Sequence, residues 1–142
     1  MPESVAALAL ARKASAVFEE RGFESPRLEA ELLLAAALGM RRLDLYLQHD
    51  RPVDTRELET FRQFVRRRLR HEPIQYITGE AHFRRLVLHV DRRVLIPRPE
   101  TEVLAGAVIE WARSRGGETS GLVAADIGTG SGAIALSLAQ EA

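Results

Sequence analysis

Residues 126–132, with the sequence Asp-Ile-Gly-Thr-Gly-Ser-Gly, carry the strongest chemical signal in the chain. Three glycines spaced two apart let a ligand approach the backbone with no Cβ in the way. The apolar run 122–125 before the loop and the run 133–139 after it indicate a strand, a loop and a helix. The N-terminus of such a helix offers free N–H groups and a positive dipole end to a carboxylate or a phosphate.

The spacing of these glycines discriminates between ligands. The nicotinamide dinucleotide fingerprint is Gly-x-Gly-x-x-Gly, whereas here the third glycine comes one residue early and position 133 is alanine. A nicotinamide-dependent oxidoreductase is therefore the least favoured interpretation. A tight turn in an α/β unit, with no ligand, stays open as the structural alternative.

No other cluster in the sequence has the composition of a catalytic or metal site. The chain has no cysteine, which excludes disulfides and thiolate ligands, and no metal site is expected. Its four histidines, His49, His71, His82 and His89, have no partner at metal-ligand spacing.

The first 75 residues are predicted to form a helical bundle. Apolar residues recur at helical spacing, serine or aspartate precedes each long helix as a cap, and glycine follows the first two as a stop. Asp54 and Glu57 have the pattern of a capping box. The expected helices cover 5–21 behind Ser4, 26–39 behind Ser25, 42–48 presenting Leu43, Leu45, Tyr46 and Leu47, and 54 to about 72.

The hydrophobic period changes after this bundle. Alternating apolar residues over 86–90, a polar turn at 91–93 and a second apolar run at 94–96 predict a β-hairpin. Prolines at 97 and 99 then hold the backbone extended. Two further elements are expected: a helix from Glu100 or Thr101 to near Gly116-Gly117, with Leu104, Val108 and Trp111 on one side, and a strand at 122–127.

Charge is balanced overall but uneven along the chain. The net charge is zero, while residues 41–93 are basic and both flanks are acidic. The basic block of Arg66, Arg67, Arg68 and Arg70 would suit an acidic protein or an RNA phosphate surface. The alternative is a solvated helix end whose arginines favour the helix dipole. The longest apolar stretch, 32–38, is too short to span a membrane and no secretion signal is evident, so a cytoplasmic protein is expected.

Several segments together resemble the glutamine methyltransferases of the HemK/PrmC family. Residues 126–136 match that family's S-adenosylmethionine loop, which many methyltransferases share. The run Ile-Pro-Arg-Pro-Glu-Thr-Glu at 96–102 is far more selective. Residues 25–33, 72–79 and Phe83 are similar as well, so the resemblance covers essentially the whole chain.

The resemblance implies an α+β chain in three parts. Residues 1–75 would be an all-α substrate-docking bundle, 76–97 a β-hairpin connector, and 98–142 the first part of a Rossmann-like domain that binds S-adenosylmethionine. Parallel strands are stable only when both faces of their sheet are covered. Because only one strand of that sheet is visible, at 122–127, the remainder is expected beyond Ala142.

The resemblance also implies an activity. Family members transfer a methyl group from S-adenosylmethionine to the side-chain amide nitrogen of the glutamine in the Gly-Gly-Gln loop of peptide-chain release factors. Close relatives modify a glutamine of a ribosomal protein, so that substrate stays open. The expected partner is a release factor, with proximity to the ribosome as an option, and neither a direct nucleic-acid site nor a membrane contact is expected.

Roles for individual residues follow from the same resemblance. The glycine loop would line the methionine part of the cofactor with its N–H groups facing the carboxylate, and the aspartate would orient the loop or accept from the cofactor's ammonium group. For Arg98 and Glu100 the alternative is a local ion pair and helix cap, and Glu102 is expected as an exposed first-turn acid. The cofactor-binding residues are Asp126, Gly128, Thr129, Gly130, Ser131 and Gly132, and the pocket wall is Pro97, Arg98, Pro99, Glu100 and Thr101.

No catalytic residue is expected within this chain. A primary amide nitrogen is a poor nucleophile, so the site must hold the amide by hydrogen bonds that favour the developing charge. In the family an Asn-Pro-Pro-Tyr motif does this, and the motif does not occur here. We therefore expect the 142-residue chain alone to be catalytically incompetent. A non-catalytic docking module for a release factor or the ribosome is the rival hypothesis.

Overall fold

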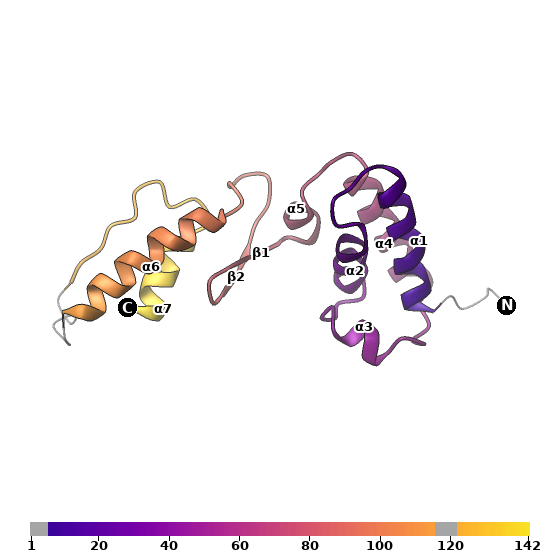
Figure 1. The fold of residues 1–142 in the computed structure, drawn as a ribbon, viewed down its shortest axis with the longest axis horizontal. Coiled ribbons are helices and arrows are strands. Elements are labelled where there is room, and N and C mark those ends of the chain that lie inside the picture. The colour runs from indigo at the N-terminus through magenta and orange to yellow at the C-terminus, as the bar shows by residue number, and fades with distance from the viewer. Residues whose placement is uncertain (1–5, 116–121) are drawn as a thin grey trace. The chain divides into compact units, whose positions relative to one another are not determined.

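The computed structural model describes residues 6–115 and 122–142, and its contacts divide the chain into two compact units, Met1–Thr78 and Gly79–Ala142. We call them unit 1 and unit 2. Helices predominate in both, and the sheet found in the described residues is one two-stranded antiparallel hairpin (Figure 1). This content confirms the predicted α+β class at a coarse level. Within the same ranges, no helix is both long and apolar enough to cross a membrane.

Unit 1 is made of helices joined by short connections (Figure 1). The four predicted helices are present with slightly shorter bounds, and glycines at 22 and 39 follow the first two in the left-handed conformation. The predicted cap Ser4 and first residue Val5 lie outside the described residues. A short helix that the sequence did not predict follows Pro73. The helices are α1 (Ala7–Glu20), α2 (Pro26–Ala37), α3 (Asp44–Leu47), α4 (Thr55–Arg68) and α5 (Ile74–Thr78).

The hydrophobic core of unit 1 forms around α2. This helix packs along α1 and also contacts α4 and α5. Phe18, Leu33, Leu34 and Leu45 are fully buried, and the ring of Phe23 lies 5.1 Å from that of Phe18. Unit 1 therefore buries an apolar core of its own.

Helix α3 differs from its prediction. Leu45 points into the core, but Leu43 and Leu47 are 63% and 73% exposed. A helix of a single turn can bury only one of its faces, whatever the number of its apolar residues. Of the three leucines that the predicted helix at 42–48 would present, only Leu45 is therefore packed in the core.

The start of α4 has the predicted capping box. The Asp54 side chain accepts a hydrogen bond from Glu57 N at 2.8 Å, and Glu57 Oε2 accepts one from Asp54 N at 3.0 Å. Arg51 also donates to the Glu57 carboxylate, at 2.7 Å. Two N–H groups that α4 would leave without partners are thus satisfied.

Replacing Asp54 by alanine is expected to lower the free energy of unfolding of unit 1 by about 1 kcal/mol, because the cap of α4 is lost. Urea denaturation followed by circular dichroism measures this change. Arg56→Ala is the control, since Arg56 is an exposed residue of the same first turn. An equal loss in both variants would contradict a specific capping role.

The hairpin of unit 2 is offset from its prediction. Strands β1 (Glu80–Phe83) and β2 (Leu86–His89) pair antiparallel, with Phe83 opposite Leu86. The predicted strand near 86–90 is present, but its predicted partner at 94–96 is wrong. The partner lies upstream, because Arg84 takes a left-handed φ of 50° and closes a two-residue turn. The turn at 91–93 does form, but no strand follows it.

Helix α6 (Pro99–Ser114) begins at Pro99, one or two residues before the predicted start at Glu100 or Thr101. Its predicted end near Gly116-Gly117 lies outside the described residues. The helix buries a narrow face of small residues and Ile109 within unit 2. Its larger apolar side chains are exposed: Val103, Leu104, Val108 and Trp111.

The strand predicted at 122–127 is not formed. The segment has no strand pairing, its last residue belongs to a turn, and Val123 and Ile127 are each 96% exposed. A strand needs backbone partners on a neighbouring strand, and none of the described residues supplies them. The helix after the glycine loop is confirmed as α7 (Ala133–Glu141), which packs on α6 and β2.

Candidate functional site

The glycine loop of unit 2 takes the conformation that its sequence requires. Gly128, Gly130 and Gly132 have φ values of 80°, 57° and 80°, which residues with a Cβ rarely adopt. Gly132 is the N-cap of α7, and its N–H donates to the Thr129 carbonyl at 2.9 Å. The loop is thus a series of left-handed turns that leads directly into a helix N-terminus.

Asp126 holds this loop against α7. Its Oδ2 accepts a hydrogen bond from the Thr129 hydroxyl at 2.9 Å and another from the backbone N–H of Ala135 at 3.2 Å. The aspartate therefore caps α7 from outside the helix and fixes the middle of the loop at the same time. Of the two roles weighed for Asp126, orientation of the loop is visible in these contacts.

The loop leaves backbone donors for a ligand. In the described part of the chain, the N–H groups of residues 128–131 and 133–134 have no hydrogen-bond acceptor. A Cβ added at Gly128 would meet no atom within 4 Å, so the space beside the backbone is open. Several N–H groups beside a helix N-terminus are suited to bind a carboxylate or a phosphate.

An apolar hollow of about 540 Å³ adjoins this loop within unit 2. Asp126 lies at its edge, and its walls come from α6, the segment 122–126 and α7. The exposed apolar face of α6 supplies one wall. The main apolar residues around it are Val108, Trp111, Leu122, Val123 and Leu138.

The predicted pocket-wall residues lie at the start of α6. Arg98 is the N-cap of that helix through its backbone alone, and Pro99 is its first residue. Neither Arg98 nor Glu100 has an ion-pair partner among the residues that the structure describes, so the local ion pair that was the alternative for these two residues is not seen there. No hydrogen bond joins this segment to the described glycine loop. Pro97 and Thr101 are partly buried, whereas Arg98, Pro99 and Glu100 are exposed.

Glu102 lies in the first turn of α6, as predicted, but its surroundings differ from the prediction. It is partly buried, and its Oε1 accepts a hydrogen bond from the backbone N–H of Arg84 at 3.0 Å. The prediction of a first-turn acid is therefore confirmed, but the predicted exposure is wrong. The contact depends on the left-handed hairpin turn, which places a backbone N–H over the first turn of α6.

The basic block is largely paired within unit 1. Arg67 donates to both oxygens of Glu72 at 2.8 Å, and Arg68 donates to Glu29 at 2.7 Å while its guanidinium lies over the Phe23 ring. These arginines join α4 to α2 and to the chain after α4. The charge argument for an acidic or RNA partner therefore rests on the two arginines of the block that remain more exposed, Arg66 and Arg70.

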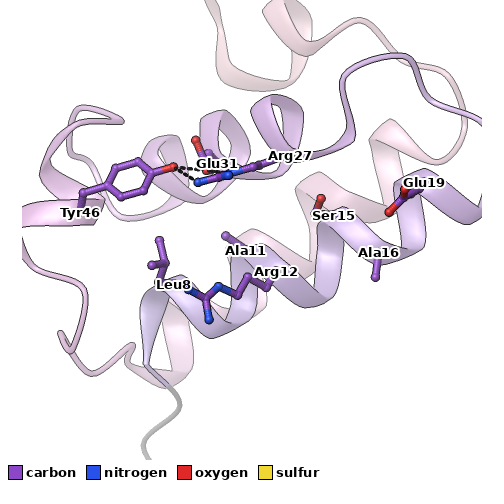
Figure 2. Close-up of a pocket in the computed structure, with 9 residues that line it drawn as sticks. All are labelled: Leu8, Ala11, Arg12, Ser15, Ala16, Glu19, Arg27, Glu31 and Tyr46. Atoms are coloured by element: carbon purple, nitrogen blue, oxygen red, sulfur yellow. Dashed lines mark hydrogen bonds and ion pairs between the residues drawn. The ribbon is translucent and has the colours of Figure 1, made fainter.

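A second hollow, of about 420 Å³, lies between α1, α2 and α3 in unit 1 (Figure 2). At its base the Glu31 side chain is only 4% exposed. Arg27 and Tyr46 point toward it in Figure 2, and Arg27 donates at 2.9 Å, Arg42 at 3.0 Å, and the Tyr46 hydroxyl donates as well. The buried carboxylate is thus satisfied internally and joins α2 to α3.

The pKa of Glu31 reports these contacts. Burial alone would raise the pKa, but the hydrogen bonds from Tyr46, Arg27 and Arg42 outweigh burial and hold it below the ordinary value of 4.5. A carboxyl group with a lowered pKa in the folded state stabilises the fold above its unfolded pKa. That contribution is lost as the pH falls through the folded pKa.

We expect Glu31→Gln to flatten the loss of unit 1 stability below about pH 4.5, where the wild-type carboxylate takes up a proton. Urea midpoints measured from pH 6 to pH 3 give the slope. Glu19→Gln, at the exposed rim of the same hollow, is the control and should keep the wild-type slope. A wild-type slope in Glu31→Gln would contradict the assignment of this pH dependence to Glu31.

The histidines are distributed over both units. His71 stacks on Phe23 with ring centroids 5.4 Å apart, and His82 and His89 belong to the hairpin. In the ranges that the structure covers, no three His, Asp or Glu side chains are grouped so as to hold a metal ion.

Comparison with known proteins gives a family match in the helical part. The model of the PrmC N-terminal domain matches residues 9–79. Curated proteins matched by the chain include one from Chlorobaculum tepidum named release factor glutamine methyltransferase. It is 49% identical over 125 residues, which are 87% of this chain and 42% of that protein.

Proteins from other bacteria bear the same name. The one from Rhodopirellula baltica is 42% identical over 87% of the chain and 42% of its own length. The one from Geobacter sulfurreducens is 44% identical over 86% of the chain and 41% of its own length. The chain thus spans about two fifths of the length of the curated relatives that it matches.

Proposed function

The chain belongs to the PrmC N-terminal domain family, and from that premise we propose that it serves the methylation of a glutamine side chain in peptide-chain release factors. The methyl donor is S-adenosylmethionine, bound at the glycine loop of unit 2. The substrate is the glutamine of the Gly-Gly-Gln loop. Relatives named release factor glutamine methyltransferase support this substrate over a ribosomal protein.

One observation carries the cofactor part of the proposal. In the described residues, the backbone N–H groups of 128–131 and 133–134 have no acceptor, and they lie where the left-handed glycine loop meets the N-terminus of α7. This donor set fits the carboxylate of the cofactor's methionine part. Asp126 uses only Oδ2 for the loop, so Oδ1 is left to accept from the cofactor's ammonium group.

The roles of the protein groups follow from the chemistry of the transfer. S-adenosylmethionine, when bound, supplies an electrophilic methyl carbon on a sulfonium. The glycine loop would bind and orient the amino-acid end, which aligns the donor for in-line displacement. Pro97 to Thr101 would form a wall of the pocket. In this proposal the chain contributes cofactor binding, and the hydrogen bonds that activate the amide nitrogen come from an Asn-Pro-Pro-Tyr motif of the whole protein.

We further propose that unit 2 is the beginning of a Rossmann-like domain. The exposed apolar side of α6 and the apolar segment at 122–127 are the surfaces that neighbouring strands of a sheet would cover. The helical residues 1–75 would dock the substrate protein, and the segment 76–97, which contains the hairpin of β1 and β2, would be the connector. A cytoplasmic location follows from a release-factor substrate.

The decisive experiment is a calorimetric titration of the chain with S-adenosylmethionine, with a nicotinamide dinucleotide as the comparison ligand. Saturable binding of the first and none of the second would support the assignment. No binding of S-adenosylmethionine to a folded chain would refute cofactor binding by this unit. Transfer of labelled methyl to a release factor by the 142-residue chain alone would contradict its proposed incompetence.

A further inference from the structure

Arg84, at the hairpin turn, has an unusual backbone and an unusual set of partners. Its φ of 50° lies in the left-handed region that residues with a Cβ seldom occupy. The backbone N–H that this conformation turns outward donates to Glu102 Oε1 at 3.0 Å. The hairpin turn is therefore fixed to the first turn of α6.

The Arg84 side chain connects the same turn to α7. Its Nε and Nη2 each donate to one oxygen of Glu141 at 3.0 Å, and its Nη1 donates to the Glu102 carbonyl at 3.2 Å. The Glu141 side chain is 3% exposed and that of Arg84 is 24% exposed. A two-point pair of this kind fixes direction as well as distance.

The sequence of α6 leaves room for this guanidinium. A Cβ added at Gly106 would lie 2.9 Å from Arg84 Nη1, so any larger residue there would displace the side chain. Arg113 of α6 also donates to the Glu141 carbonyl, at 2.8 Å. The C-terminal end of α7 is thus held by the hairpin and by α6 together.

Helix α7 carries this restraint to the glycine loop. It begins at its N-cap Gly132 and ends at Glu141, a length of about 13 Å as a rigid helix. Since Asp126 fastens the loop to the first turn of α7, a shift of the helix along its axis would move the loop with it.

We propose that Arg84 is a positioning residue for cofactor binding: through Glu141 it sets the place of α7 and hence of the glycine loop. This inference rests on the proposed binding of S-adenosylmethionine at that loop. Arg84 itself touches no part of the loop.

The test compares Arg84→Ala and Arg84→Lys with Arg85→Ala. Arg85 is the exposed neighbour whose Nε lies 3.7 Å from Glu141, so it controls for charge and for the hairpin. Arg84→Ala is expected to raise the Kd for S-adenosylmethionine about tenfold, and Arg84→Lys is expected to fall between it and wild type, because lysine cannot make the two-point contact. Arg85→Ala is expected to bind like wild type.

Hydrogen exchange without ligand gives a second readout that does not depend on the cofactor. The amides of 126–136 should exchange faster in Arg84→Ala and in Gly106→Ala than in Arg85→Ala. Wild-type exchange of this segment in both of the first two variants would overturn the proposal, as would an unchanged Kd. If wild type itself fails to bind S-adenosylmethionine, the proposed function fails, and the exchange result alone decides the role of Arg84. If Arg84→Ala does not fold, Gly106→Ala serves as the test variant, because its added Cβ displaces the Arg84 side chain.

Discussion

Replacing Phe18 by alanine is expected to lower the free energy of unfolding of unit 1 by about 3–5 kcal/mol. The side chain is 0% exposed and lies on the inner face of α1. Its ring contacts Phe23, on which the guanidinium of Arg68 and the ring of His71 also stack. The substitution would therefore leave a cavity beneath a group of rings that the surrounding helices cannot easily close.

Urea denaturation followed by circular dichroism measures the loss. Val17→Ala is the matched control, because Val17 is the adjacent residue and is exposed. This substitution should lower the free energy of unfolding by less than about 1 kcal/mol. Trp111 is the only tryptophan and belongs to unit 2, so its fluorescence follows that unit separately. A loss below 1 kcal/mol for Phe18→Ala would mean that α1 is not packed as described.

The helices of unit 1 were predictable because their signals are local. The capping box at Asp54 and Glu57, the proline at 26 and the glycines at 22 and 39 mark helix ends by their own conformational preferences. Helix α3 was less predictable, since its apolar residues Leu45, Tyr46 and Leu47 do not indicate which one faces the core. Only packing against α1 and α2 selects Leu45.

The strand errors in unit 2 have a common cause, which is that a strand forms only with a partner that its own residues do not identify. The alternation at 86–90 was right, but it fitted an upstream or a downstream partner equally well. No glycine or asparagine marks the turn at Arg84, whose left-handed φ is held by Glu102 of α6. The apolar run at 122–127 has the composition of a strand, but it has no described partner with which to pair.

In the candidate site, too, features set by local residue types were predictable, whereas contacts between distant residues were not. The left-handed glycines and the helix after them follow from the residue types alone. The attachment of Asp126 to α7 requires the loop to fold back over nine residues, and the pair between Arg84 and Glu141 spans 57 residues. A loop-orienting role of Asp126 was among the predictions, but no sequence pattern marks either of these two contacts.

Replacing Asp126 by alanine is expected to weaken S-adenosylmethionine binding about 10- to 100-fold, on the premise that the glycine loop binds this cofactor. The loop would lose both hydrogen bonds to Oδ2, and the N–H of Ala135 would lose its acceptor. Hydrogen bonds to a charged group contribute about 1.5–3 kcal/mol each, part of which the free chain recovers from water.

Graded variants separate the two roles of Asp126. Asp126→Asn keeps an oxygen acceptor for the loop but removes the charge that would face the cofactor's ammonium group. Thr129→Val removes one loop contact and leaves the carboxylate intact. If orientation of the loop dominates, Asp126→Asn binds nearly as well as wild type and Thr129→Val is weakened; if the charge dominates, the order is reversed. Glu80→Ala, an exposed acid of the same unit, is the control. Wild-type affinity in Asp126→Ala, measured by calorimetry, would remove the aspartate from the site altogether.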